Sequence, residues 1–355
     1  MKAFSANQSS AGIIGVDAMG ADKGPAEVVR GVRMALKEIP GIEKIILVGR
    51  EKALSRLIRA SHLDKEPRLS IHPASEVIGM EEKPIESLRR KKDASMVRTV
   101  ELMREGRCQA VVSCGNTGSL MACGTLKLRT MPGVERPALA TVIPGAQRHW
   151  VLADVGANPV PKPKYLVHNA ILGSDYARIT LGLNKPRVGL ISIGTEEGKG
   201  SPAVNEAHEM LKSIDGLIDY QGLVEGFQLF KGQVDVAVCD GFTGNVLLKS
   251  CEGILDSFRG VLKTEIRRTP ARMLGGLLLL KAFRDMRRKL NPEQYGGALL
   301  LGLKGNIFKA HGSSNATAIM NAIGQAASAV DQQLYVHSVE AVKEGNKRIA
   351  ALKKV

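Results

Sequence analysis

The stretch that decides the fold runs from residue 110 to residue 128 and reads AVVSCGNTGSLMACGTLKL. A short apolar run, 110–112, leads into the glycine-bracketed loop 115–118, and residues at helical spacing follow from Ser119. A strand, a tight glycine loop and a helix start leave backbone N–H groups unpaired and directed at one point, which favours an anion. One such loop can equally be a simple turn, so the prediction depends on whether the pattern recurs.

The pattern recurs along the chain. We expect strands at 13–16, 45–48, 69–72, 140–143, 150–153, 188–193 and 234–239, and helices at 25–37, 51–61, 95–105, 165–181, 202–213, 246–264 and 316–344. Alternating elements with continuous apolar strands predict a largely parallel sheet covered on both faces. Ligands of such sheets bind beyond the carboxyl ends of the strands, so we expect the glycine loops to gather at one rim.

Length and composition indicate a soluble globular protein. The chain has 355 residues, of which 44% are hydrophobic, and it can form one α/β unit or two lobes. We divide it into a loose leader (1–11), a catalytic unit (12–345) and a basic tail (346–355). The leader lacks the apolar core of a secretory signal, which favours the cytoplasm. The five cysteines include no CxxC pair, so we expect reduced thiols and no zinc site.

The net charge of +15 favours an acidic partner: nucleic acid, an anionic membrane surface or an acidic protein. Aromatic residues make up only 4% of the chain, which argues against the stacking platforms that bind single-stranded nucleic acid. The chain contains no nucleic-acid-binding motif that we recognise. We therefore expect no nucleic-acid partner, while composition does not separate membrane from protein.

A basic and apolar segment lies at about 259–290. It holds ten Lys or Arg residues against Glu265 and Asp285, and it surrounds the run MLGGLLLLKAF, 273–283. This run is shorter than the about 20 residues that span a bilayer. A basic amphipathic or hairpin-like arm that enters an anionic interface fits better. The residues expected to make that contact are Leu277, Leu278, Leu279, Leu280, Arg284 and Arg287. An oligomer interface, or a core helix with a charged back, explains the segment equally well.

Four consecutive cations, RRKK at 89–92, precede the helix that leads into residue 110. A solvated charged turn is the ordinary explanation of such a cluster. Their position beside the predicted anion site makes Lys91 and Lys92 candidate partners for an anion.

Nine motifs carry a resemblance to a known family. In chain order they are VDAMGAD (16–22), RRKKDASM (89–96), CGNTGSLMA (114–122), RPALA (136–140), DVGAN (154–158), IGTEEGKGS (193–201), VCDGFTGNVLLK (238–249), YGGALLLGL (295–303) and AHGSSNA (310–316). With them the chain resembles the acyl-carrier-protein:phosphate acyltransferases of bacterial phospholipid synthesis, the PlsX family. The motifs extend over about residues 12–328. The sequence departs from the family pattern at 159–163 and at Asn315, where Asp is expected.

The resemblance implies an activity and a fold. The activity is transfer of a long-chain acyl group from acyl carrier protein to inorganic phosphate, giving acyl phosphate for a membrane glycerol-phosphate acyltransferase. The fold is a three-layer α/β/α sandwich similar to phosphotransacetylases and to isocitrate and isopropylmalate dehydrogenases. The resemblance also implies a homodimer without a cofactor, which is cytoplasmic and peripherally associated with the inner face of the membrane.

The chemistry of this reaction requires two adjacent anion sites, one for the attacking phosphate and one for the thioester oxyanion. Phosphate is the nucleophile, so no covalent enzyme intermediate is needed. Removing one preorganised N–H donor raises the activation free energy by about 3–4 kcal/mol at comparable sites. As catalytic residues we predict His311 (the acid), Lys92 and Asn116. As substrate- or phosphate-binding residues we predict Gly115, Thr117, Gly118, Ser119, Asp154, Asn158, Lys199, Asp240, Thr243, Asn245, Gly312, Ser313 and Ser314.

Each role has a structural alternative. His311 can instead pack against or cap the neighbouring helix. Asp17, Asp154 and Asp240 all sit at strand ends and could converge, but they can equally cap helices or hold loops. We find no carboxylate cluster at ligand spacing and expect no metal.

Three other functions remain open at this point. An NAD(P)-dependent decarboxylating dehydrogenase of the same fold should show Mg²⁺-binding carboxylates and an adenine loop, and a CoA-dependent phosphotransacetylase should show a nucleotide pocket. A non-catalytic membrane or carrier-protein adaptor would not need so many phosphate-type loops.

Overall fold

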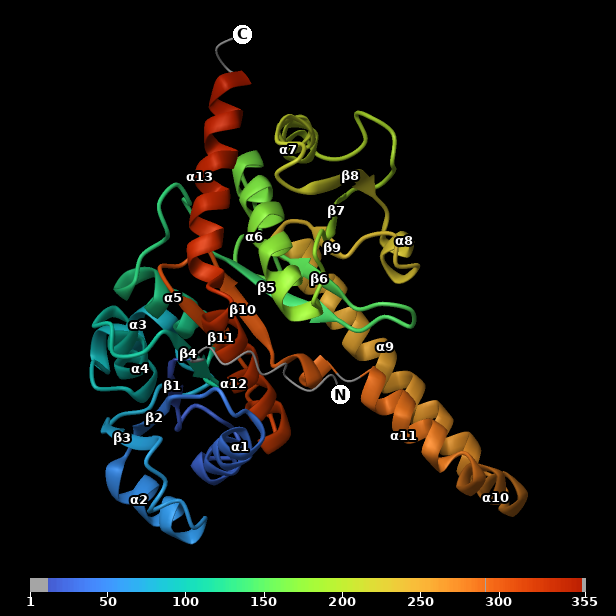
Figure 1. The fold of residues 1–355 in the computed structure, drawn as a ribbon. Coiled ribbons are helices and arrows are strands. Elements are labelled where there is room, and N and C mark those ends of the chain that lie inside the picture. Colours follow the sequence, from blue (N-terminus) through green and yellow to red (C-terminus); the bar gives the residue numbers. More distant parts are fainter. Residues whose placement is uncertain (1–11, 291, 353–355) are drawn as a thin grey trace.

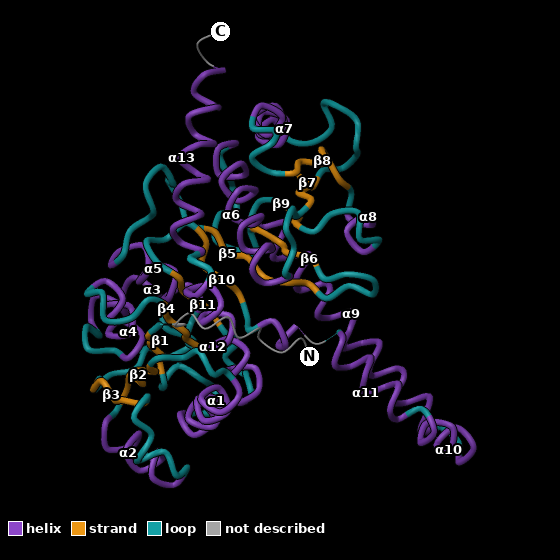
Figure 2. The backbone as a smooth tube through the Cα atoms, viewed as in Figure 1, coloured by secondary structure: helices purple, strands orange, loops and turns teal. Residues whose placement is uncertain are grey.

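The computed structural model describes residues 12–290 and 292–352, so the predicted leader 1–11 lies outside the described residues. The chain forms one 11-stranded sheet in the order β3-β2-β1-β4-β11-β10-β5-β6-β9-β7-β8 (Figures 1 and 2). The strands are β1 (Ile13–Asp17), β2 (Lys44–Gly49), β3 (Leu69–Pro73), β4 (Ala110–Ser113), β5 (Ala138–Ile143), β6 (Trp150–Ala153), β7 (Arg187–Ile191), β8 (Asp219–Val224), β9 (Val236–Val238), β10 (Ala298–Leu301) and β11 (Asn306–Lys309).

The sheet is mostly parallel, which confirms the predicted fold class. Only β10 with β11, β10 with β5, and β5 with β6 pair antiparallel. As a result β1–β5 and β11 run in one direction, whereas β6–β10 run in the other. The loops that follow the two sets of strands therefore leave the sheet by opposite edges.

Helices cover both faces because the buried strands are apolar on both sides. Val112 of β4 belongs to the core on one face, while Val111 belongs to the core on the other. The first face packs against α1 (Pro25–Glu38), α2 (Glu51–Ala60), α6 (Pro163–Leu181), α7 (Pro202–Ser213), α12 (Ala316–Asp331) and α13 (Leu334–Leu352). The second packs against α4 (Ser95–Arg104), α5 (Thr117–Lys127), α8 (Gly226–Phe230) and the start of α9 (Gly241–Arg267).

Several elements differ from the prediction. The single helix predicted at 316–344 is two helices, because Gln333 takes a positive φ of 52° between α12 and α13. The predicted basic tail is helical as far as Leu352, and it is tied down because the Asn346 amide bonds to His168 Nε2 (3.0 Å) and to the Gly133 carbonyl (3.3 Å). The sequence pattern did not indicate α3 (Pro84–Arg90), α8, β8, β10 or β11 as regular elements.

The basic apolar segment is a helical hairpin that extends away from the sheet (Figure 1). The long helix α9 leads outward, α10 (Pro270–Leu278) packs against its end, and α11 (Leu280–Lys289) follows. No residue of α10 is buried, and Leu278 is 82% exposed. The segment is therefore an exposed helical hairpin, which excludes the core-helix alternative. Arg284 is exposed, whereas the side chain of Arg287 lies outside the description.

Candidate functional site

The strands β4 and β11 end side by side, and their loops leave the sheet at the same point. Ser113 pairs with Lys309, and the Ala310 N–H donates to the Ser113 carbonyl (3.0 Å). Loops 114–119 and 310–315 begin directly after these residues. We call this place, with the neighbouring end of β1, the β4–β11 rim. It unites the GNTGS and HGSSN loops, as the sequence predicts.

The buried carboxylate of Asp17 connects the elements of the β4–β11 rim by hydrogen bonds. Asp17 at the end of β1 is 1% exposed and accepts hydrogen bonds from the Ser113 hydroxyl (2.7 Å) and the Met19 N–H (3.2 Å). Burial raises the pKa of Asp17, and its hydrogen bonds with Ser95 and Ser113 counter that effect. Asp17 thus joins β1, β4 and the first turn of α4, which is the structural role considered for it.

The start of α5 is the open helix end of the rim. Asn116 caps α5 by accepting from the Ser119 N–H (2.9 Å), and its amide donates to the Met80 carbonyl. Both ends of the Asn116 amide are therefore used by the chain itself, so its predicted catalytic role gains no support. The first amides of a helix have no partner within it, which leaves those of Thr117 and Gly118 for an anion.

Helix α12 is different, because its first turn is already occupied. The carboxylate of Glu27, which is 8% exposed, accepts from the Ala316 N–H (2.7 Å), and Asn315 accepts from the Ala318 N–H (2.9 Å). The start of α12 is therefore not open to a ligand. The protein supplies its own anion to that helix end, and Asn315 caps it without needing the Asp expected from the family pattern.

His311 presents a defined donor at the rim. The side chain is exposed, and its Nδ1 accepts from the Ser313 N–H (3.2 Å) and lies 2.8 Å from the Ser313 hydroxyl. Since Nδ1 is an acceptor, the neutral ring carries its proton on Nε2. The next residue, Gly312, packs closely against Met80: a Cβ at this position would lie 2.1 Å from Met80 Cε. Ser314 is 1% exposed and belongs to the packed base of the loop.

Lys309, the last residue of β11, was not among the residues predicted from the sequence. The side chain is only 8% exposed, and Nζ donates to the Ala310 carbonyl. Burial lowers the pKa of Lys309, and among the titratable groups near it are Cys114, Asp22, Asp17 and Lys249 on α9. The available signal was a lysine inside the apolar run IFKA, 307–310.

The loops DVGAN and DGFTGN lie elsewhere. They follow β6 and β9, which run opposite to β4 and β11, so they leave the sheet by its other edge. Asp154 is fully buried and accepts from the N–H groups of Leu139, Gly156, Ala157 and Asn158 at 2.8–3.1 Å. These bonds hold the loop in shape, and no hydrogen bond among the described residues joins it to the β4–β11 rim.

The remaining predicted residues of these loops also serve local structure. Asp240 caps α9 by accepting from the Thr243 N–H (2.8 Å) and hydroxyl (2.6 Å). The Asn158 amide donates to the Pro137 carbonyl (2.8 Å), and Asn245 lies beside Gly156. The expectation of one common rim for all the glycine loops is therefore wrong. The cause is the antiparallel pairing of β5 with β6, after which β6, β7, β8 and β9 run opposite to β4 and β11.

The two lysines predicted at the site, Lys92 and Lys199, belong to different loops. Lys199 belongs to the loop after β7 and leaves by the edge of the DVGAN loop. Lys92 is exposed and lies three residues before Ser95, which bonds to Asp17 at the β4–β11 rim. Lys91 is instead held by the Val77 carbonyl (2.7 Å) and by Glu82.

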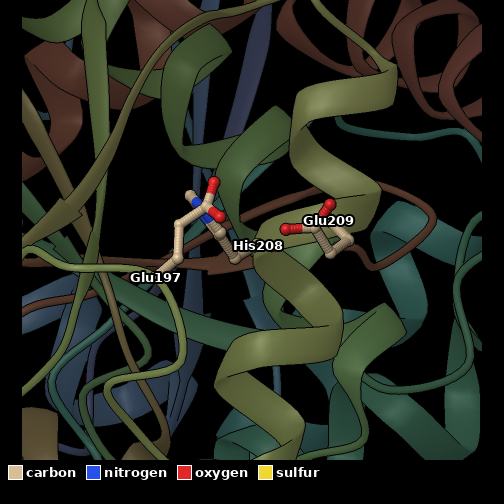
Figure 3. A group of neighbouring side chains, drawn as sticks. All are labelled: Glu197, His208 and Glu209. Carbon is tan, nitrogen blue, oxygen red and sulfur yellow. The ribbon is translucent and has the colours of Figure 1, made fainter.

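A group of possible metal ligands lies away from this rim, at α7 and the loop before it. Glu197, His208 and Glu209 come close together there (Figure 3). Lys212 already pairs with Glu197 and with Glu209 (3.0 Å), and His208 Nδ1 lies 2.7 Å from the Tyr220 hydroxyl. We interpret the group as an ion-pair cluster that supports α7.

The cysteines are unsuited to nucleophilic attack. Burial raises the pKa of the Cys108, Cys114 and Cys123 thiols to about 12, and it also raises the pKa of Cys239 and Cys251. All five are free thiols, as predicted. At neutral pH they remain protonated.

Comparison with known proteins confirms the resemblance. The family described as "Fatty acid synthesis protein" matches residues 13–337. The phosphate acyltransferase of Nitratidesulfovibrio vulgaris is 45% identical over 330 residues, covering 93% of this chain and 94% of that protein. The phosphate acyltransferase of Heliobacterium modesticaldum is 44% identical over 319 residues, covering 90% and 94%.

Solved structures agree on the fold. A phosphotransacetylase from Streptococcus pyogenes superimposes with a TM-score of 0.60 at 17% identity, covering 92% of this chain and 95% of that one. At this identity the likeness shows the architecture alone, whereas the match to the family and the identity to its relatives extend over nearly the whole chain. The relatives from Nitratidesulfovibrio vulgaris and Heliobacterium modesticaldum are both named phosphate acyltransferase. The chain thus belongs to the fatty acid synthesis protein family, and it is an acyltransferase.

Proposed function

We propose that the protein transfers a long-chain acyl group from acyl carrier protein to inorganic phosphate. A phosphate oxygen attacks the thioester carbonyl carbon, the carbon–sulfur bond breaks, and the carrier thiol leaves with a proton to give acyl phosphate. The observation that carries this proposal is the β4–β11 rim, where an open helix start, cationic lysines and an imidazole donor come together. Each of these groups suits negatively charged oxygen.

The roles follow from the geometry of the rim. The amides of Thr117 and Gly118, with the ammonium of Lys92 nearby, suit the phosphate. The Nε2–H of His311 suits the developing oxyanion or the leaving sulfur. A thiol has a pKa of about 8.5, so protonating the leaving group is a modest task. Direct attack by phosphate is also consistent with the protonated state of the buried cysteines.

The partners follow from charge and exposed apolar surface. We propose that the positive protein guides the acidic carrier protein to the rim. Leucines at the tip of the hairpin contact an anionic membrane from its cytoplasmic side, since Leu277 is 60% and Leu278 82% exposed. The shaft of α9 exposes Ile254, Phe258 and Val261, which supports a homodimer that packs along this helix. No described helix is both long and apolar enough to span a bilayer.

One assay separates this proposal from its alternatives. Purified protein is mixed with phosphate and, in parallel, with long-chain acyl–acyl carrier protein, acyl-CoA or a hydroxy acid plus NAD, and acyl phosphate is trapped with hydroxylamine. We expect acyl phosphate from the carrier-protein thioester. Turnover of acyl-CoA alone would favour a phosphotransacetylase, and NAD reduction alone would favour a dehydrogenase, and either result would contradict the proposal.

A further inference from the structure

Lys309 is a buried cation without a matching anion. Its side chain is 8% exposed, and its one hydrogen bond goes to the neutral Ala310 carbonyl. Asp17 and Asp22 lie near enough to influence it, but no described carboxylate forms an ion pair with it. Burying a charge is costly unless it is paired, so this ammonium is better suited to a bound anion than to the empty site.

The position of Lys309 indicates which anion. Its partner across the strand pair is Ser113, two residues before the glycine loop that opens α5. The side chain lies on the face of the sheet that α4 and α5 cover, because its neighbour Ile307, two residues earlier, packs in that core. Lys249 of α9 also lies near it, but that ammonium already pairs with Glu252 (2.8 Å). A small, multiply charged oxyanion matches a buried ammonium beside an open helix start.

We propose that Lys309 is the phosphate-binding cation of the β4–β11 rim: on binding, its ammonium exchanges the Ala310 carbonyl for a phosphate oxygen. This assignment rests on the proposed function and adds a residue to it. The exchange replaces a neutral acceptor by a charged one, and such hydrogen bonds are about twice as strong. In the empty protein the same ammonium opposes folding, because its burial is compensated only by a carbonyl.

Two neutral variants and one matched control test the assignment. Lys309→Met and Lys309→Gln remove the charge at similar length, and Lys304→Met removes an exposed lysine at the other end of the β10–β11 hairpin. Phosphate is titrated into each folded protein while thermal unfolding is followed. The KM for phosphate, the KM for acyl–acyl carrier protein and kcat are then measured separately.

We expect phosphate to stabilise the wild type and Lys304→Met but not the Lys309 variants, whose KM for phosphate rises by about ten- to a hundred-fold. Without phosphate, Lys309→Met unfolds at the same or a higher temperature than wild type. A phosphate response like that of wild type in the Lys309 variants would overturn the assignment, as would loss of the folded state in both. Phosphate binding by wild type without acyl transfer would contradict the proposed function alone.

Discussion

The leucines at the hairpin tip give a quantitative prediction about membrane binding. Leu277, Leu278, Leu279 and Leu280 are 52–82% exposed, and α10 has no buried residue. Fully burying a leucine side chain stabilises by about 1.5–3 kcal/mol, so burying the exposed part of each contributes roughly 1 kcal/mol or more. Replacing all four by Ser should therefore cost about 4 kcal/mol, or roughly a thousand-fold in partitioning.

The measurement is co-sedimentation with anionic vesicles and, in parallel, with neutral vesicles. We expect Leu278→Ser alone to weaken binding by about ten-fold and the fourfold variant to abolish it, with acyl transfer in solution unchanged. Val336→Ser on α13, which removes an apolar side chain that is 47% exposed outside the hairpin, is the control and should bind like wild type. Unaltered binding of the fourfold variant would refute the reasoning.

Three further predictions concern the framework of the rim and of the sheet. Replacing Asp154 by Ala leaves its buried N–H donors unsatisfied and should lower the free energy of unfolding by about 3–5 kcal/mol in urea titration; a change below about 1 kcal/mol would contradict the role given to it. Glu27→Ala exposes the start of α12 and should cost about 1–2 kcal/mol by the same measurement, whereas a neutral effect would show that the helix end is satisfied otherwise. Burial lowers the pKa of His168 in the folded protein, so the unfolded chain binds a proton at this residue at a higher pH than the folded protein does. The free energy of unfolding should therefore fall as the pH drops below about 6.5. The unfolding temperature of His168→Gln should therefore depend less on pH between about 7 and 5, and an equal slope would exclude His168 as a cause.

The sequence predicted the strands and loops that depend on local pattern. The run 110–112, the glycine loop and α5 lie where the apolar residues and glycines indicate them, and the HGSSN loop joins them at the rim. The exposed hairpin also follows from its composition. These features are set by neighbouring residues, so a single sequence is enough to predict them.

The sequence pattern did not allow the relative direction of the strands to be predicted. Nothing in the runs ALATVI at β5 and WVLA at β6 indicates that these strands pair antiparallel, yet this pairing places Asp154 and Asp240 at the other edge from Lys309. The sequence pattern also does not show that the start of α12 is occupied by a carboxylate. That carboxylate belongs to Glu27, which lies 289 residues earlier in the chain. Contacts between distant segments decide which polar residues remain free for a ligand.

The most direct test of the central claim, that the β4–β11 rim carries acyl transfer, compares one residue from each edge of the sheet. His311→Gln removes the rim donor, and Lys199→Met removes a cation from the loop at the other edge. The rate of acyl phosphate formation is measured for both at saturating substrates. We expect a fall of about a hundred-fold or more for His311→Gln and a rate near wild type for Lys199→Met. The reverse pattern would contradict the account.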